Sequence, residues 1–355
     1  MTISISSIEH PYSKVKEKKD KPLHILSKWE VLFDETESQD SLISIIICAF
    51  SLQRAHMTVD CINSVLNNNY KFFEIIVVVD GNKELKQKME SEFKGITKVL
   101  IIGDLKDEGP SIARNRGIGF AKGKIIAFID DDAYAPVDWL ERISKNFVDY
   151  PDIMAMGGKL LPVYENGSQK LPDELLWIIG CTYKGHPENS QFVRNVISAN
   201  MAVKKDVFKE INFEITFHRK NRILFFPIKQ LEDTLFGIRL NNKKSDAILY
   251  DPETIVFHNV PKERLTLNYI IKRTFSEGIG KAKLGHIIGQ NVVKNEMFLQ
   301  EQNYSKILFI STIKYFFTFR IKNSFLLSLA ALSVIVGYIS ECILNIHDDT
   351  KYYGK

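Results

Sequence analysis

Paired cysteines at metal-binding spacing are missing from this sequence. The four cysteines, Cys48, Cys61, Cys181 and Cys342, lie far apart and form no CxxC motif. This pattern argues against a structural zinc site and against a disulfide framework. Cys48 lies inside an apolar run, so we expect it to be a small buried hydrophobic residue. The cysteine usage fits a reducing, cytoplasmic setting.

A leader segment and a strong net charge are missing as well. Residues 1–22 carry several lysines, but no apolar stretch follows them, so we expect no signal peptide. The net charge is only +4, which is too weak to indicate a nucleic-acid partner. Hydrophobic residues make up 45% of the chain and charged residues 25%, as in an ordinary globular protein. The 355 residues suffice for one large domain with an appendage.

Short apolar, β-branched runs alternate with helical patterns along the chain. The runs that predict buried strands are Leu42–Phe50, Phe73–Val79, Val99–Ile102, Lys124–Ile129, Ile153–Gly158, Asn195–Val203 and Ala247–His258. The patterns that predict helices are Ala55–Asn67, Lys83–Phe93, Pro110–Ala121, Pro136–Val148, Leu231–Leu240 and Leu265–Lys283. This alternation predicts an α/β fold with a mostly parallel sheet flanked by helices. We expect a polar extension over residues 1–40, the α/β domain over 41–260 and a helical C-terminal region over 261–355.

One predicted strand ends abruptly in three carboxylates, Asp130, Asp131 and Asp132. Because side chains alternate along an extended backbone, Asp130 and Asp132 can point one way and Asp131 the other. Two oxygen ligands on one side suit Mg²⁺ or Mn²⁺, particularly when a phosphate supplies further oxygens. Ligands of open α/β sheets bind at this end of the strands. The alternative is a solvated acidic turn that caps the next helix, and it would be favoured if the triplet stood alone.

The triplet does not stand alone, because other motifs surround it in a recognisable order. An SIII strand, a VVVD strand end, GPSIARNRG, FIDDDA and a downstream ED follow one another. This order resembles the family 2 glycosyltransferases of the GT-A fold, over roughly residues 42–260. SANMAV, GCTY, His258 and Arg273-x-x-x-Glu277-Gly278 are similar to a membrane-associated subgroup of archaea and bacteria. That subgroup builds lipid-linked or surface glycans and includes glucosyl-dolichyl-phosphate glucuronosyltransferases.

The resemblance implies a hexosyltransferase that takes a sugar from a nucleotide-sugar donor, with a UDP-sugar favoured. The acceptor would be lipid-linked or a glycan, and the pathway would be cell-surface glycan synthesis or protein glycosylation. The resemblance places Asp132 on a Mg²⁺ or Mn²⁺ ion that stabilises the leaving diphosphate. Asp130 would lie beside the ion, or reach the ribose instead. His258 is a further candidate ligand, and a purely structural role for it is about equally favoured.

The resemblance also implies contacts on the nucleotide-sugar side of the site. The candidates there are Ala49, Phe50, Arg54, Asp80, Arg114, Asp130 and Asp131. The family usually carries a Tyr or a similar residue where Phe50 stands, so one hydroxyl contact is missing. Asp80 would accept a hydrogen bond from the base, and a turn role beside Gly81 is compatible with that. For Arg54 and Arg116, surface ion pairing is the favoured alternative.

The pair Glu232-Asp233 matches the family's ED motif. The resemblance makes Asp233 the general base and Glu232 a residue that orients the acceptor or a neighbouring group. The alternative is that both carboxylates simply favour a helix N-terminus. One catalytic carboxylate implies an inverting single displacement. Since the sequence has no QxxRW motif, we expect one sugar per encounter, with Trp177 and Tyr183 as candidates for either the acceptor side or ordinary packing.

An apolar stretch near the C-terminus raises the question of a membrane. Ser324–Ser340 is uncharged, and a membrane span takes about 20 apolar residues. Lys314, Arg320 and Lys322 precede it and would stay in the cytoplasm. We expect residues 324–344 to associate with the cytoplasmic face of the cell membrane, as a single span or as an interfacial helix. The basic helix that carries Lys272, Arg273, Lys281 and Lys283 would face lipid phosphates or, alternatively, solvent.

Two other functions compete with the transferase. A nucleotidyltransferase usually carries a Gly-rich, basic loop after its first strand, and Cys48–His56 contains no glycine. A non-catalytic, nucleotide-sugar-binding scaffold of a membrane glycan-assembly complex would be expected to lose the acidic triplet or the ED pair. Both motifs are present. The residues therefore favour an enzyme.

Overall fold

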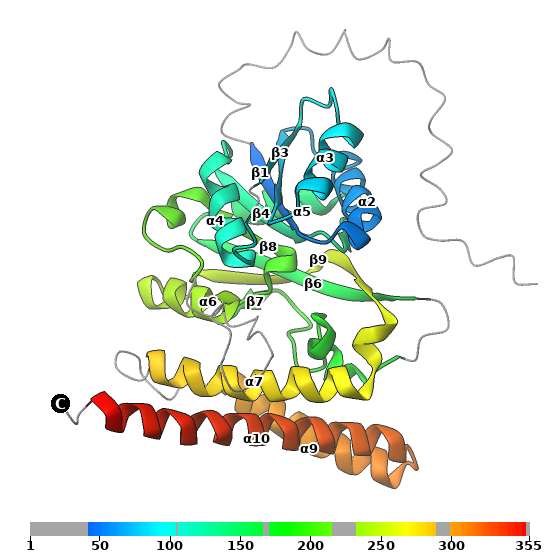
Figure 1. Ribbon diagram of the computed structural model, residues 1–355, viewed down its shortest axis with the longest axis vertical. Coiled ribbons are helices and arrows are strands. Elements are labelled where there is room, and N and C mark those ends of the chain that lie inside the picture. The colour runs from blue at the N-terminus through cyan, green and yellow to red at the C-terminus, as the bar shows by residue number, and fades with distance from the viewer. Residues whose placement is uncertain (1–41, 104–105, 166–169, 215–231, 289–298, 353–355) are drawn as a thin grey trace, which may run out of the picture. The chain divides into compact units, whose positions relative to one another are not determined.

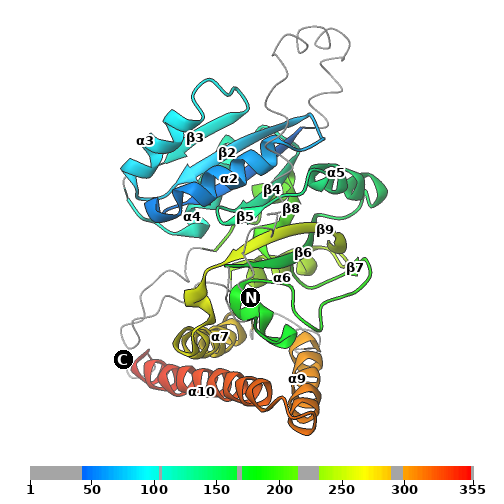
Figure 2. The ribbon, with the colours of Figure 1, turned by 90° about the vertical axis from the view of Figure 1, so that its right-hand side faces the viewer.

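A β-sheet is the framework of the fold. A computed structural model describes residues 42–103, 106–165, 170–214, 232–288 and 299–352 of the protein. The predicted polar extension over residues 1–40 lies outside these ranges. The strands are β1 (Ile43–Ala49), β2 (Phe73–Val79), β3 (Val99–Gly103), β4 (Ile125–Asp130), β5 (Ala133–Tyr134), β6 (Ala155–Tyr164), β7 (Gln191–Phe192), β8 (Met201–Lys204) and β9 (Ile248–Val260). Their order is β3-β2-β1-β4-β8-β6-β9-β5, with β7 beside β9 (Figures 1 and 2).

The predicted α/β class is confirmed, but the sheet is mixed. The four strands β3, β2, β1 and β4 are parallel to one another. Strand β8 runs antiparallel to both β4 and β6. Strand β9 is parallel to β6 and antiparallel to β5 and β7. The sequence pattern could not reveal the change of direction, because a strand buried on both faces is a continuous apolar run whichever way its neighbour points.

Helices cover both faces of the sheet. They are α2 (Ala55–Leu66), α3 (Lys83–Glu92), α4 (Pro110–Phe120), α5 (Trp139–Asp149), α6 (Glu232–Lys243), α7 (Leu267–Ile288), α9 (Leu299–Phe317) and α10 (Ile321–Tyr352). Short 3₁₀ segments are η3 (Leu52–Arg54), η4 (Asp173–Ile179), η5 (Ser198–Asn200), η6 (Lys205–Lys209) and η8 (Lys262–Leu265). Helices α2, α3 and α5 bury one face of the sheet, whereas α4, α6 and η6 bury the other.

Strand β1 illustrates why these residues form a central strand. Ile43, Ile45 and Ile47 pack into the core on the α2 side, and Ile46 packs into the core on the α4 side. All four side chains are almost completely buried. Apolar side chains are therefore required on both faces of the sheet, which explains the apolar run that only Ser44 interrupts.

The strand predicted at Asn195–Val203 begins only at Met201. Asn200 is the reason, because its side chain makes three buried hydrogen bonds. Its Oδ1 accepts from the indole N–H of Trp139 at 2.9 Å. Its amide nitrogen donates to the carbonyl oxygens of Lys159 and Thr254, at 3.1 and 2.8 Å. These bonds hold residues 198–200 in a 3₁₀ turn and bring that turn to the edge of the site.

The C-terminal helices form a separate layer. Helices α7 and α10 lie side by side in both views, with α9 next to them (Figures 1 and 2). A third apolar core joins them to η4 through Leu175, Ile178, Ile270, Leu327 and Ala330. The helical C-terminal region therefore packs on the same body that carries the sheet.

Candidate active site

A single large cleft collects most of the residues singled out in the sequence. Its volume is 1180 Å³, and it lies at the carboxyl ends of β1, β2 and β4. From there it continues past η5 and the start of α6 to η4, α7, α9 and α10. Its wall contains every candidate residue, namely Ala49, Phe50, Arg54, Asp80, Arg114, Asp130, Asp131, Asp132, Glu232, Asp233 and His258.

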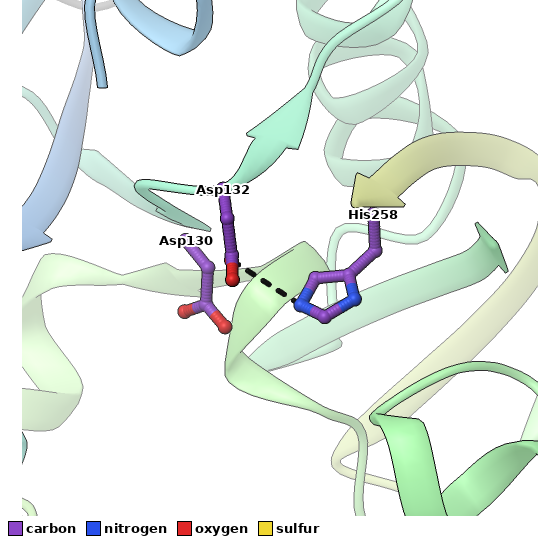
Figure 3. A group of neighbouring side chains, drawn as sticks. All are labelled: Asp130, Asp132 and His258. Carbon is purple, nitrogen blue, oxygen red and sulfur yellow. Dashed lines mark ion pairs between the residues drawn. The ribbon is translucent and has the colours of Figure 1, made fainter. Parts of the chain in front are cut away.

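Asp130, Asp132 and His258 form a possible metal site in this cleft. Asp130 ends β4, and the pairing of β5 with β9 places Ala133 opposite His258. One ligand atom from each of the three residues lies within 4.8 Å of the others. Figure 3 shows the two carboxylates and the imidazole facing a common space. Carboxylate oxygens with an imidazole nitrogen form a donor set that Mn²⁺ and related ions accept.

His258 and Asp132 are an ion pair. The imidazole Nε2 lies 3.3 Å from Asp132 Oδ1, and both residues are buried. Burial alone would lower the pKa of His258, but the Asp132 carboxylate outweighs it and raises that pKa to about 10. Burial acts against Asp132 in the same way, yet His258 and two arginines hold the pKa of Asp132 well below its usual range. The Sγ of Cys181, in the GCTY stretch, lies 3.9 Å from the other ring nitrogen.

Two arginines meet at the acidic triplet. Arg54 Nη1 donates to Asp132 Oδ2 at 3.0 Å, and Arg54 also pairs with Asp131. Arg264 Nη2 reaches the same Asp132 oxygen at 3.2 Å. Arg54 is thus not a surface ion pair, because it belongs to the site. Sequence reasoning missed Arg264, whose only signal was its place soon after the end of a predicted strand.

One end of the cleft is built by β1, β2 and the start of α4, and it carries the residues that we expect on the nucleotide side. Ala49 is buried, while Phe50 is exposed and lies beneath the Arg54 guanidinium, 5.0 Å from it. The buried Asp80 carboxylate accepts hydrogen bonds from the backbone N–H groups of Glu108 and Gly109, at 3.1 and 2.7 Å. Burial raises the pKa of Asp80, and these two bonds oppose that rise. Asp80 therefore fixes the loop that leads into α4.

Arg114 links the acidic triplet to the ED pair. Its Nη2 lies 4.0 Å from Asp130 Oδ1, and its Nη1 lies 3.6 Å from Glu232 Oε1. The guanidinium also lies over the ring of Phe213, 5.4 Å from its centre. The neighbouring carboxylates of Asp233, Glu232 and Asp130 outweigh burial and raise the pKa of Arg114. Arg116, by contrast, pairs with Glu108.

One carboxylate oxygen of Asp233 accepts a hydrogen bond, and the other has no hydrogen-bond partner among the described residues. The turn η5 aims the backbone N–H of Ser198 at Asp233 Oδ2, at 2.9 Å. The buried Oδ1 has no hydrogen-bond partner within the part of the chain that the structure describes. Burial and Glu232 raise the pKa of Asp233 to about 6, against the opposing effect of Arg114. A carboxylate with a raised pKa and an unpartnered oxygen can accept a proton from a bound hydroxyl.

The far end of the cleft combines aromatic rings with a partly buried ionic network. Trp177 and Tyr183 line it, and Arg273 lies 5.4 Å from the centre of the Trp177 ring. Arg273 pairs with Glu277 at 3.0 Å, and Lys281 pairs with Glu301 at 3.1 Å. Arg273 and Lys281 of the predicted basic helix therefore face the cleft and not the solvent.

Residues 44–212 match the family model described as glycosyl transferase family 2. The chain is 28% identical over 241 residues to the glucosyl-dolichyl phosphate glucuronosyltransferase of Haloferax volcanii, covering 67% of this chain and 76% of that protein. It is 23% identical over 296 residues to an uncharacterized glycosyltransferase of Haemophilus influenzae, covering 77% and 91%.

Among solved structures, S. aureus TarS 1–349 in complex with UDP is similar, with a TM-score of 0.45 and 15% identity. This similarity covers 83% of this chain and 88% of TarS. The matched family domain includes β1, β2, α4 and the acidic triplet, which build one end of the cleft. The α/β fold, the motif order and the family match agree: residues 44–212 form a glycosyl transferase family 2 domain, and the protein is a glycosyltransferase.

Proposed function

We propose that this protein is an inverting, metal-dependent glycosyltransferase that moves one sugar from a nucleotide-sugar donor to a lipid-linked acceptor. The pathway would be cell-surface glycan synthesis or protein glycosylation. One observation carries the proposal: Arg114 joins a carboxylate of the acidic triplet to the ED pair within one cleft. A donor phosphate group and an acceptor hydroxyl bound at these two ends would meet over Arg114.

The donor side would hold the nucleotide and its diphosphate. Ala49, Phe50 and Asp80 would surround the base, because they stand at the ends of the first two strands. Arg54 and Arg264 already gather at the triplet, and a guanidinium offers the forked donors that phosphate oxygens prefer. These cations would bind the donor diphosphate beside Asp131 and Asp132. A UDP-sugar is the first donor to test.

Asp130, Asp132 and His258 would hold Mg²⁺ or Mn²⁺, which fits their donor set and spacing. When bound, such an ion supplies Lewis-acid stabilisation of the leaving diphosphate. A histidine ligand must be neutral, so the proton that His258 carries here would leave when the ion binds. Cys181 and Asp132, on the two ring nitrogens, support the orientation of the ring.

Asp233 would be the general base. The acceptor hydroxyl oxygen attacks the anomeric carbon from the face opposite the diphosphate, and its proton passes to Asp233 Oδ1. The bond between the anomeric carbon and the diphosphate oxygen breaks, and the diphosphate leaves with the electron pair. Ser198 would hold the other oxygen of Asp233, and Arg114 would keep Asp233 ionised. One displacement inverts the anomeric configuration.

A lipid-linked acceptor is favoured over a free glycan because of where the cleft ends. Its lining includes Ala330, Ala331, Val334 and Ile335 of the apolar helix α10. Helix α10 is long and apolar enough over Ile321–Leu344 to cross a membrane, with a mean hydropathy of 2.0. The name of the Haloferax volcanii relative also specifies a dolichyl phosphate substrate. We propose that the protein works at the cytoplasmic face of the cell membrane.

A thermal-shift screen tests the donor half of this proposal. The purified protein and Asp132→Asn are melted with UDP-, GDP- and TDP-sugars, each with and without Mn²⁺. A ligand at about 100 times its Kd stabilises the native state by about 2.7 kcal/mol, so binding is measurable. We expect a metal-dependent rise in Tm for one nucleotide class, and its loss in Asp132→Asn. No rise with any nucleotide would contradict a nucleotide-sugar donor and favour a lipid-phosphate donor.

A transfer assay tests the acceptor half. The donor identified by the melts is incubated with a glycosylated polyprenyl phosphate or with a water-soluble oligosaccharide. We expect product with the lipid-linked acceptor. Product with the soluble glycan alone would contradict the lipid assignment and leave the donor assignment intact.

A further inference from the structure

Helices α7 and α10 approach each other at two glycines. A Cβ atom on Gly278 of α7 would lie only 2.0 Å from the carbonyl oxygen of Val334 on α10. A Cβ atom on Gly337 of α10 would lie 2.1 Å from the carbonyl oxygen of Phe275 on α7. Neither distance is possible for a real side chain without movement of a backbone. Small residues of this kind allow helices to pack backbone to backbone.

Further contacts extend this interface in both directions. The hydroxyl of Ser333 donates to the carbonyl oxygen of Ile271 at 3.0 Å. Towards the C-terminal ends, Lys283 Nζ lies 3.7 Å from Glu341 Oε1. Residue numbers rise together along the two helices, so α7 and α10 run in parallel. Figures 1 and 2 show the pair side by side.

Over residues 321–344, helix α10 buries one narrow stripe and exposes the opposite face. The buried positions recur at helical spacing, at Ser324, Leu327, Ala330, Ser333, Gly337 and Glu341. The opposite face, which we call the outer face, is apolar and about half exposed: Phe325, Leu332, Ile335, Val336, Ile339 and Ile343. An exposed apolar surface of this length marks a contact with a membrane or with another protein.

The turn before α10 favours a membrane as the partner. Phe316, Phe317 and Phe319 are exposed there, and Phe319 reaches 90%. Arg320 and Lys322 follow at once and are exposed as well. Aromatic rings settle at the level of lipid headgroups, and basic side chains are attracted to anionic lipids. The exposed aromatic and basic side chains of residues 316–322 therefore match an anionic lipid surface.

The charged side chains of α7 favour a flat orientation of α10 at the lipid surface over a spanning one. Arg273, Glu277, Lys281 and Lys283 lie on α7 within the stretch that runs beside α10. If α10 crossed the bilayer, its parallel partner would bring these charges into the hydrocarbon, where each is expensive. Helix α7 would have to enter the bilayer together with α10, because the backbones of the two helices are in contact at Gly278 and Gly337. A helix that lies flat keeps the α7 charges on the protein side.

We propose that α10 lies in the plane of an anionic lipid surface, with its outer face in the acyl boundary and residues 316–320 among the headgroups. This inference rests on the membrane association in the proposed function and adds its geometry. Ile335 belongs both to the outer face and to the lining of the cleft. The cleft would therefore open onto the lipid, and a membrane-bound acceptor would reach Asp233 without leaving the bilayer completely.

Depth-dependent quenching of tryptophan fluorescence distinguishes a flat helix from a spanning one. Three full-length variants, Phe325→Trp, Leu332→Trp and Ile339→Trp, are bound to phosphatidylcholine–phosphatidylglycerol vesicles. The lipids carry bromine either near the headgroup or near the end of the acyl chain. The outer positions, 325 and 339, are about 21 Å apart along the helix axis, which is most of a hydrocarbon core. Wild type supplies the background, and Val148→Trp, on exposed α5, is the matched control.

We expect all three tryptophans to be quenched by the shallow bromine to the same extent, with no added quenching in the control. Strong deep quenching of Leu332→Trp, with shallow quenching of the other two, would overturn the proposal in favour of a span. No added quenching at any position would overturn the lipid contact itself. Neither result would change the thermal shifts that nucleotide sugars produce. Failure of this inference can therefore be distinguished from failure of the transferase assignment.

Charge removal tests the anionic lipid. The double variant Arg320→Gln, Lys322→Gln should bind phosphatidylglycerol-containing vesicles more weakly, by roughly 5-fold for each charge. Its binding to pure phosphatidylcholine should match that of wild type. Lys88→Gln, an exposed lysine of α3, is the control and should bind as wild type does. Equal binding of the double variant and wild type to anionic vesicles would contradict the proposed role of this turn.

Discussion

The guanidinium of Arg114 lies 3.6 Å from the carboxylate of Glu232, so the helix before the acidic triplet contacts the helix that begins with the ED pair. Arg114 is nearly buried, and its other guanidinium nitrogen faces Asp130. One buried cation thus balances carboxylates from two separate motifs. This arrangement keeps the proposed metal site and the proposed base at a fixed separation.

Asp233→Asn should abolish sugar transfer and preserve donor binding. An amide cannot accept the proton of the attacking hydroxyl, and general-base catalysis typically contributes about 10²–10⁴-fold in rate. We expect kcat to fall by that range while the metal-dependent thermal shift persists. Asp206→Asn, an exposed carboxylate of η6, is the control. Unchanged transfer by Asp233→Asn would make the base assignment wrong.

The pH profile should show an acid limb that belongs to Asp233. Its pKa is raised to about 6, so the carboxylate is ionised above that pH and protonated below it. As a base it must be ionised, and kcat/KM should therefore rise with pH through about 6. Arg114→Gln removes the charge that lowers this pKa, so the limb should move to higher pH. A limb that stays in place, in a variant that still melts cooperatively, would exclude Asp233 as its origin.

Asp132→Asn should remove divalent-metal binding. The Asn side chain keeps the size of Asp132 but has no charge and a weaker ligand oxygen. Titration calorimetry with Mn²⁺ should show binding to wild type and a large loss in the variant. Asp138→Asn is the matched control, because its carboxylate pairs with Arg142 away from the triplet. Full Mn²⁺ affinity in Asp132→Asn would rule out the proposed ligand.

Arg264→Gln should weaken donor binding more than it slows the chemical step. Charge-assisted hydrogen bonds contribute about 1.5–3 kcal/mol, so KM for the nucleotide sugar should rise by roughly 10-fold or more. Steady-state kinetics with Arg142→Gln as a control measure this effect. A fall in kcat with an unchanged KM would place Arg264 in a different role.

Gly278→Ala should destabilise the protein, whereas Gly285→Ala on the same helix should not. The added methyl group at Gly278 would meet a carbonyl oxygen of α10, and overpacking of this kind costs about 1–3 kcal/mol. No atom lies within 4 Å of a Cβ at Gly285, and Ala favours a helix over Gly by up to about 1 kcal/mol. Denaturant melts should show opposite shifts for the two variants. Equal shifts would mean that α7 and α10 do not pack tightly.

The N-terminal half of the fold, from β1 to β4, was largely predictable from local patterns. Strand β2 matches its predicted bounds, and α2, α3 and α4 begin where the helical patterns begin. The reason is that β-branched runs and amphipathic spacing encode burial, which local sequence expresses directly. The mixed sheet was not predictable, since β8 is buried and apolar whichever way it runs between β4 and β6.

The candidate site was also only partly predictable from the sequence. Asp130, Asp132 and Asp233 were found from motifs, because carboxylates that follow a buried strand or begin a helix are visible in sequence. The sequence did not reveal that Arg54 pairs with the triplet, that Ser198 contacts Asp233 or that Arg264 pairs with Asp132. Each depends on segments far apart in the chain, and a charged residue alone does not specify its partner.

The sequence by itself determined the fold class, the family and the acidic groups, since these follow from periodicity and from the order of short motifs. Only the tertiary structure decided which cations neutralise those acids and how α10 packs against α7. Composition made Ser324–Ser340 equally suitable for a span or an interface. Packing against α7 resolves that ambiguity in our proposal, because two glycines hold α10 to a helix whose charges belong outside the hydrocarbon.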